Sequence, residues 1–170
     1  MNASRVLLCV VVAAAVMGFA SCSGRMPSQP LVGEVTSGTV SDSLLQANLG
    51  RWSESHVVSY RYRFRWECYC PQEALRIVDI TVTRGVITSV TDAKTGVALD
   101  PLAAAQYRTI DGLFAFVRDA IDGSAARVTG AFDPRLGYPS TATIDYNLSV
   151  SDEEKGFQIL SVRPSLLPLP

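Results

Sequence analysis

Cys68 and Cys70 are the residues whose types and spacing bear most directly on chemistry. They end a segment, residues 57–70, in which apolar or aromatic side chains alternate with mainly arginine. Two residues with this spacing in a β-strand point to the same face, but their Cα atoms lie about 6.5 to 7 Å apart, at the outer limit for a disulfide. A bulge, or the turn begun by Pro71, would bring them together. Three interpretations stay open: a local disulfide, which we favour, a strained redox pair, and half of a metal site.

The metal and nucleophile interpretations lack partners in the sequence. Zinc generally needs four ligands, and the only histidine, His56, belongs to a different element with no second cysteine pair. A thiolate nucleophile is disfavoured on an apolar strand face. The carboxylates of Asp133, Asp145 and residues 152–154 do not have the spacing of an EF-hand calcium loop, and solvated hairpin carboxylates are their ordinary explanation. We therefore expect no cofactor, no metal and no catalytic residue.

A row of arginines is the best candidate for a binding surface. Arg61, Arg63 and Arg65 alternate with the aromatic residues and share one strand face with Tyr69. Arginine and tyrosine are favoured at protein interfaces, so this row is suited to an anionic or protein partner. The alternative is a solvated sheet face whose arginines pair across strands with Glu73, Asp79 or Asp145.

Tyr138 is a second candidate for contact with a partner. It lies in a loop of turn-forming residues, where Gly137 and Pro139 would present its ring rigidly. The alternative is that Tyr138 simply enters the next strand.

The alternation in residues 57–70 also predicts the core of the fold. A strand places the arginines on one face, and a slip of one residue would turn three arginines into the core, so the register is tightly fixed. The other face is apolar and carries Val58, Tyr60, Tyr62, Phe64, Trp66, Cys68 and Cys70.

The remaining pattern predicts an α+β fold with a single antiparallel sheet of about six strands and two helices on one face. One helix begins at a capping box formed by Ser43 and Gln46, and the other is capped by Thr109 and ended by Gly123. Residues 101–107 are compatible with a short helix. Strands are expected at residues 57–70, 78–83, 86–90, 126–132, 142–150 and 157–162.

Two segments, residues 43–92 and 109–163, have the same order of one helix followed by three strands. We interpret this as an α-β-β-β pseudo-duplication. The alternative is that two ordinary α+β segments share an element order.

The N-terminal residues are typical of an export signal. Residues 6–16 form an apolar run that is too short to span a bilayer as a mature helix, and small residues lead from it to a cysteine. Phe19-Ala20-Ser21-Cys22 resembles the lipobox of bacterial lipoproteins, with Phe19 where leucine is usual. This resemblance implies cleavage after residue 21, acylation of Cys22, and a lipid anchor on the extracytoplasmic face of a cell membrane. An ordinary cleaved signal is the alternative.

We expect residues 22–42, rich in serine, glycine, threonine and proline, to be a flexible tether for a single domain at 43–163, and residues 164–170 to be a proline-rich tail. The composition fits one domain, with 48% hydrophobic and 18% charged residues. A formal charge of −1 offers no general attraction to nucleic acid, so none is expected as a partner.

Several short motifs together resemble domain-of-unknown-function family 6174, made of bacterial secreted lipoproteins. The resemblance runs from about Leu44 to Val162 and implies an exported, mostly lipid-anchored domain with no assigned activity, so no catalytic residue is carried over. The element order also resembles small secreted modules of the PepSY and β-lactamase-inhibitor type, which bind proteins. The motifs are Trp52, Tyr60, Tyr62, Cys68-Tyr69-Cys70, Arg84-Gly85-Val86, Thr109-Ile110-Asp111, Leu113-Phe114, residues 132–139, Ile144-Asp145 and Asp152-Glu153-Glu154.

The sequence thus favours a non-catalytic, lipid-anchored module that binds an envelope or secreted protein or is otherwise associated with the envelope, and a purely structural envelope component is a further interpretation. The alternative is a thiol/disulfide redox protein or enzyme that uses Cys68 and Cys70. The sequence predicts neither the partner nor the oligomeric state.

Overall fold

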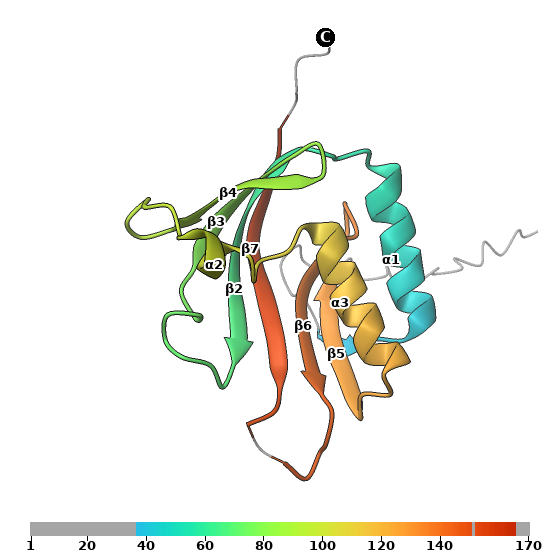
Figure 1. Ribbon diagram of the computed structural model, residues 1–170. Helices are drawn as coiled ribbons and strands as arrows, with labels where there is room; N and C mark the ends of the chain where they lie inside the picture. The colour runs from blue at the N-terminus through green and yellow to red at the C-terminus, as the bar shows by residue number, and fades with distance from the viewer. Residues whose placement is uncertain (1–36, 151, 166–170) are drawn as a thin grey trace, which may run out of the picture. The chain divides into compact units, whose positions relative to one another are not determined.

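The computed structural model describes residues 37–150 and 152–165. They form one antiparallel seven-stranded sheet with the strand order β1-β5-β6-β7-β2-β3-β4, together with three helices (Figure 1). The strands are β1 (Gly38–Thr39), β2 (Tyr60–Cys68), β3 (Val78–Thr83), β4 (Val86–Asp92), β5 (Arg127–Phe132), β6 (Pro139–Asp145) and β7 (Lys155–Pro164). The helices are α1 (Asp42–Glu54), α2 (Pro101–Ala104) and α3 (Ile110–Asp122).

The side chains of β2 divide between the two faces of the sheet as the alternation predicts. Tyr60, Tyr62 and Phe64 are each no more than 1% exposed, whereas Arg61 and Arg63 are exposed. The aromatic rings form a continuous row, with centroids 5.8 Å apart between Tyr60 and Tyr62 and 6.0 Å apart between Tyr62 and Phe64. Aromatic pairs at such separations contribute about 0.5–1.5 kcal/mol beyond their buried area, so this row stabilises the centre of the core.

The helices begin at side-chain caps and pack on the apolar face. The Thr109 hydroxyl accepts a hydrogen bond from the Gly112 N–H at the start of α3, and Gly123 ends that helix, as predicted. Helix α3 contacts β5 and β6, and α1 contacts α3 (Figure 1). The Trp52 indole N–H of α1 donates to the Asp111 carboxylate of α3 over 3.2 Å, which ties the two helices together.

The predicted repetition of element order is present in the structure. The segments α1-β2-β3-β4 and α3-β5-β6-β7 each end in a three-stranded antiparallel meander. Pairing between β7 and β2 joins the two meanders into one sheet, so the two halves share a single apolar face. The fold is therefore the predicted α+β arrangement, with seven strands rather than about six.

Two of the differences from the sequence-based expectations lie in the first half of the chain. The cap of α1 is Ser41, whose hydroxyl accepts from the Leu44 N–H, so Ser43 and Gln46 lie inside the helix instead of forming a capping box. Strand β2 begins at Tyr60, and Val58, expected on the apolar face, is 57% exposed.

Two further differences concern the ends of elements elsewhere. Strand β6 ends at Asp145, where the carboxylate accepts the Asn147 N–H and turns the chain, so the alternation that continues through Tyr146 and Leu148 lies in an exposed loop. Residues 38–42, expected in the tether, belong to the fold: β1 pairs with β5, and Val40 is buried.

The other expectations for the chain ends lie outside the described residues. These are the signal peptide, Cys22, the tether up to residue 36, and the tail from residue 166. None of the helices in the described part of the chain is long and apolar enough to cross a membrane.

Candidate functional site

The arginine row lies on the sheet face opposite to the core, where the side chains of three central strands meet. We call this the open face, defined by Arg61, Arg63, Asp79, Ser161 and Arg163, which line a hollow of about 130 Å³. Arg63 stands between Asp79 of β3 and Ser161 of β7, and Arg61 stands between Thr81 and Arg163. Because side chains alternate between the two faces along β2, β3 and β7, these polar groups lie together on one face of the sheet.

Two arginines of the row have carboxylate partners. The Arg63 Nε–H donates to Asp79 Oδ1 and an Nη2–H donates to Oδ2, both over 2.9 Å. This fork-like pair, helped by the nearby charges of Arg61 and Arg163, holds the pKa of Asp79 below its usual value, although partial burial acts in the opposite direction. The guanidinium of Arg65 donates to Glu67 over 2.9 Å on the same strand. Of the cross-strand partners considered from sequence, Asp79 is confirmed, whereas Asp145 pairs with Arg127 instead.

Arg61 and Arg163, by contrast, form no ion pair among the described residues. They are direct partners in the register between β2 and β7, and both are exposed on the open face. Among the described residues, no carboxylate lies within ion-pair distance of either guanidinium, because both oxygens of Asp79 bind Arg63. Like charges directly opposite each other in a sheet are destabilising. The residues that line the hollow therefore carry three guanidinium groups and one carboxylate, so Arg61 and Arg163 share with Arg63 the single negative charge of Asp79.

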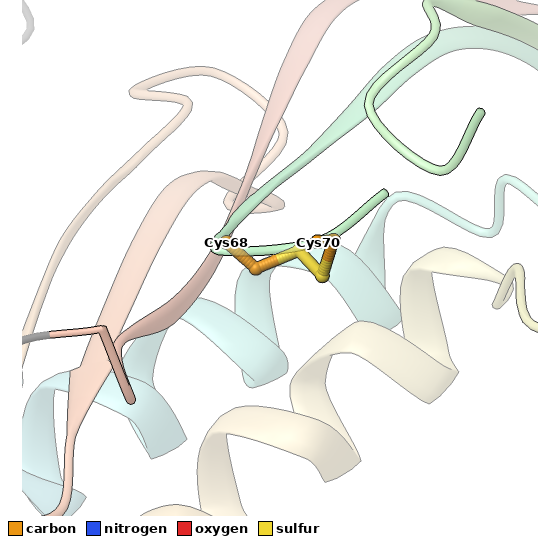
Figure 2. Close-up of a disulfide and its surroundings, with 2 residues drawn as sticks. All are labelled: Cys68 and Cys70. Atoms are coloured by element: carbon orange, nitrogen blue, oxygen red, sulfur yellow. A yellow bond between two sulfur atoms is a disulfide. The ribbon is translucent and has the colours of Figure 1, made fainter. Parts of the chain in front are cut away.

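The cysteine pair forms a disulfide at the end of β2 (Figure 2). The Cα atoms lie 5.2 Å apart, closer than in a regular strand, because β2 ends at Cys68 and the chain then turns. The Cys70 N–H donates to the Cys68 carbonyl oxygen over 2.9 Å, which closes a three-residue turn centred on Tyr69. The local disulfide favoured from the sequence is thus the form seen here, and its turn leaves Tyr69 83% exposed.

Tyr138 does not share a surface with the arginine row. Its ring packs edge-on against Trp52 of α1, with centroids 6.3 Å apart, and is half-buried. Burial, with a smaller contribution from the Asp133 carboxylate, raises the pKa of Tyr138 to about 12. Its loop is therefore attached to the helical side of the sheet, and the five residues proposed from sequence do not form one surface.

Residues 44–164 match the model of a family of unknown function, DUF6174. The chain belongs to this family. The match covers nearly all of the described fold, from α1 to the last residue of β7. No curated protein and no solved structure matched the chain.

The remaining polar candidates of this DUF6174 domain have local structural roles. The Asp133 carboxylate accepts hydrogen bonds from the N–H groups of Arg135 and Leu136 and so shapes its own loop. His56 is exposed just beyond α1, with a φ of 51°. Within residues 37–150 and 152–165, no group of three or more histidine, cysteine or carboxylate side chains is placed to hold a metal ion.

Arg163 is the residue of the DUF6174 open face that sequence reasoning missed. The sequence did contain a signal for the sheet face of Arg163. Val162 is half-buried on the core side, and it alternates with the exposed residues Ser161 and Arg163. The position of Arg163 opposite Arg61 depends on the pairing of β7 with β2, which no local pattern reveals.

Proposed function

We propose that this DUF6174 domain is an exported, lipid-anchored module whose open face binds an acidic segment of another envelope or secreted protein. The observation that carries the proposal is the pairing of Arg61 with Arg163 in the strand register, two exposed arginines that, among the described residues, have no carboxylate within ion-pair distance.

An anion bound between Arg61 and Arg163 would relieve the repulsion between them. Two like charges on directly opposed strand positions cost stability, and an anion placed between them removes that cost while gaining charge-assisted hydrogen bonds. The hollow that Arg61, Arg63 and Arg163 line also contains the Ser161 hydroxyl, a further donor for a carboxylate oxygen. Arg63 is already held by Asp79, so the anion is expected to bind mainly between Arg61 and Arg163.

The hollow is small, about 130 Å³, and lies on a sheet face, which suits single carboxylate side chains of a polypeptide better than a whole enclosed small molecule. Thr81 and Thr143 add neutral hydrogen-bonding groups to the face, while the formal charge of the whole chain, −1, gives no general attraction to nucleic acid. A carboxylate-bearing protein segment is the partner that matches these features.

The export and anchoring part of the proposal rests on the sequence before and at Cys22, which lies outside the described residues. The Cys68–Cys70 disulfide supports it, because disulfides persist in oxidising compartments outside the cytoplasm.

The proposal predicts that the protein binds an unstructured peptide of alternating glutamate and serine, with an affinity that falls as salt is raised. Replacing both charges, Arg61→Gln with Arg163→Gln, is expected to weaken binding at least tenfold, or about 1.4 kcal/mol, as measured by isothermal titration calorimetry. A peptide in which glutamine replaces glutamate is expected not to bind.

The matched control removes two arginines elsewhere, Arg84→Gln with Arg135→Gln. Both lie in exposed turns, after β3 and after β5. The control is expected to bind like the wild type. Equal losses in the two double variants would mean that only the overall charge matters, and absence of binding by the wild type would contradict the acidic-segment proposal.

A further inference from the structure

An apolar cavity opens on the other side of the sheet, beside the disulfide. It has a volume of about 190 Å³, and its apolar walls come from Trp66, Cys68, Cys70, Ala74 and Phe116. Trp66 and Cys68 belong to the end of β2, Cys70 and Ala74 follow that strand, and Phe116 belongs to α3. None of these residues takes part in the open face, so the cavity is a separate feature of the molecule.

The walls of this cavity are held in place by packing and by a covalent bond. The Trp66 ring contacts Phe64 at 4.9 Å and Phe116 at 5.7 Å between centroids, both edge-on. The disulfide fixes the turn that carries Cys70 (Figure 2). A preformed apolar wall lowers the entropic cost of binding, because little has to be ordered when a ligand enters.

Lys155 gives the cavity a positive charge where an apolar residue is expected. Lys155 pairs in the strand register with Cys68 of β2 and Ile144 of β6. The next two residues of β7 on the same face, Phe157 and Ile159, belong to the core. Lys155 itself is exposed and lines the cavity together with the neutral Gln106. Among the described residues, none that lines the cavity is a carboxylate, so the ammonium group offers an ion-pair partner at a largely apolar site.

We propose that this cavity binds a small amphipathic carboxylate, with an aromatic ring or a short alkyl chain against Trp66 and Phe116 and its carboxylate at Lys155. The volume is suitable for one ring with a short substituent, since an apolar protein cavity of about 150 Å³ takes up benzene. The aromatic walls provide the apolar contact, and Lys155 selects an acid over its neutral analogue.

A titration of the unmodified protein with 3-phenylpropionate tests this proposal. Heteronuclear NMR spectra monitor the indole N–H signals during the titration. The chain has two tryptophans, Trp52 and Trp66. The Trp66 signal is expected to shift in a saturable way. The Trp52 signal is expected to stay in place, because its N–H is bonded to Asp111 between the helices and serves as an internal control. Trp66→Phe assigns the two signals.

Two comparisons test the role of the charge. The neutral amide 3-phenylpropanamide is expected to bind at least tenfold more weakly than the acid, and Lys155→Gln is expected to remove that preference. Lys155 is exposed, so this substitution leaves the core intact. Equal affinities of the wild type for the acid and the amide, an unmoved Trp66 signal, or equal shifts of both indoles would overturn the proposal.

Discussion

Replacing Gly137 with alanine is expected to lower the free energy of unfolding by about 2–5 kcal/mol. Gly137 has a φ of +82°, a conformation that costs a residue with a Cβ about 1–2 kcal/mol. An added Cβ would also lie 2.5 Å from the Asn48 carbonyl oxygen and 2.9 Å from the Arg51 Cβ, both in α1. Relieving such an overlap requires the loop to move off the helix, at about 1–3 kcal/mol.

Gly96 provides the matched control for this substitution. Its φ of +72° is similar, but an added Cβ would have no atom within 4 Å. Gly96→Ala is therefore expected to cost only about 1–2 kcal/mol, the strain of the backbone alone. Urea unfolding followed by circular dichroism measures both variants. Equal losses would show that the loop carrying Tyr138 is not seated on α1.

Raising the pH above about 10 is expected to destabilise the protein steeply because Tyr60 and Tyr62 are buried. Burial raises the pKa of both hydroxyls above that of an exposed tyrosine, about 10. The folded state then holds these two protons more tightly than the unfolded state. The resulting stabilisation is complete below pH 10 and is lost as the pH rises towards the pKa values of the folded state. Above pH 10, each of the two hydroxyls lowers the free energy of unfolding by up to about 1.4 kcal/mol per pH unit.

Single tyrosine variants measured by urea unfolding across pH 7 to about 11.5 test this dependence. Tyr62→Phe is expected to reduce the slope above pH 10, because one buried titrating group is gone. Tyr60→Phe is also expected to cost about 1–3 kcal/mol at neutral pH, since the Tyr60 hydroxyl oxygen accepts the Ile110 N–H over 2.8 Å at the start of α3. Tyr69→Phe, at an exposed ring, is the control. Identical slopes for the wild type and Tyr62→Phe would contradict the assignment.

Features with a local physical cause could be predicted from the sequence. The faces of β2 follow from its period of two, and the turn at Arg84 and Gly85, both with positive φ, follows from a glycine flanked by two alternating segments. The start of α3 at Thr109 follows from side-chain capping. These parts required no knowledge of what each segment packs against.

Features set by distant parts of the chain could not be predicted in this way. Arg163 faces Arg61 only because β7 pairs with β2, and Tyr138 is fixed by Trp52 of α1. The apolar alternation through Tyr146 and Leu148 continues beyond the point where pairing stops, because the Asp145 carboxylate diverts the backbone into a loop. In each case contacts between distant parts of the chain, or a side chain that ends the strand, determine a structure that the local alternation does not predict.

We propose above all that Arg61 and Arg163, which are partners in the strand register, serve to bind an anionic partner and not to stabilise the sheet. The most direct test measures, in Arg61→Gln, Arg163→Gln and the double variant, both urea unfolding and affinity for the glutamate-serine peptide. We predict that each single substitution changes the free energy of unfolding by less than about 1 kcal/mol, because the lost repulsion between the arginines is offset by the lost attraction to Asp79, while peptide affinity falls. A loss of stability with unchanged peptide affinity would contradict this proposal.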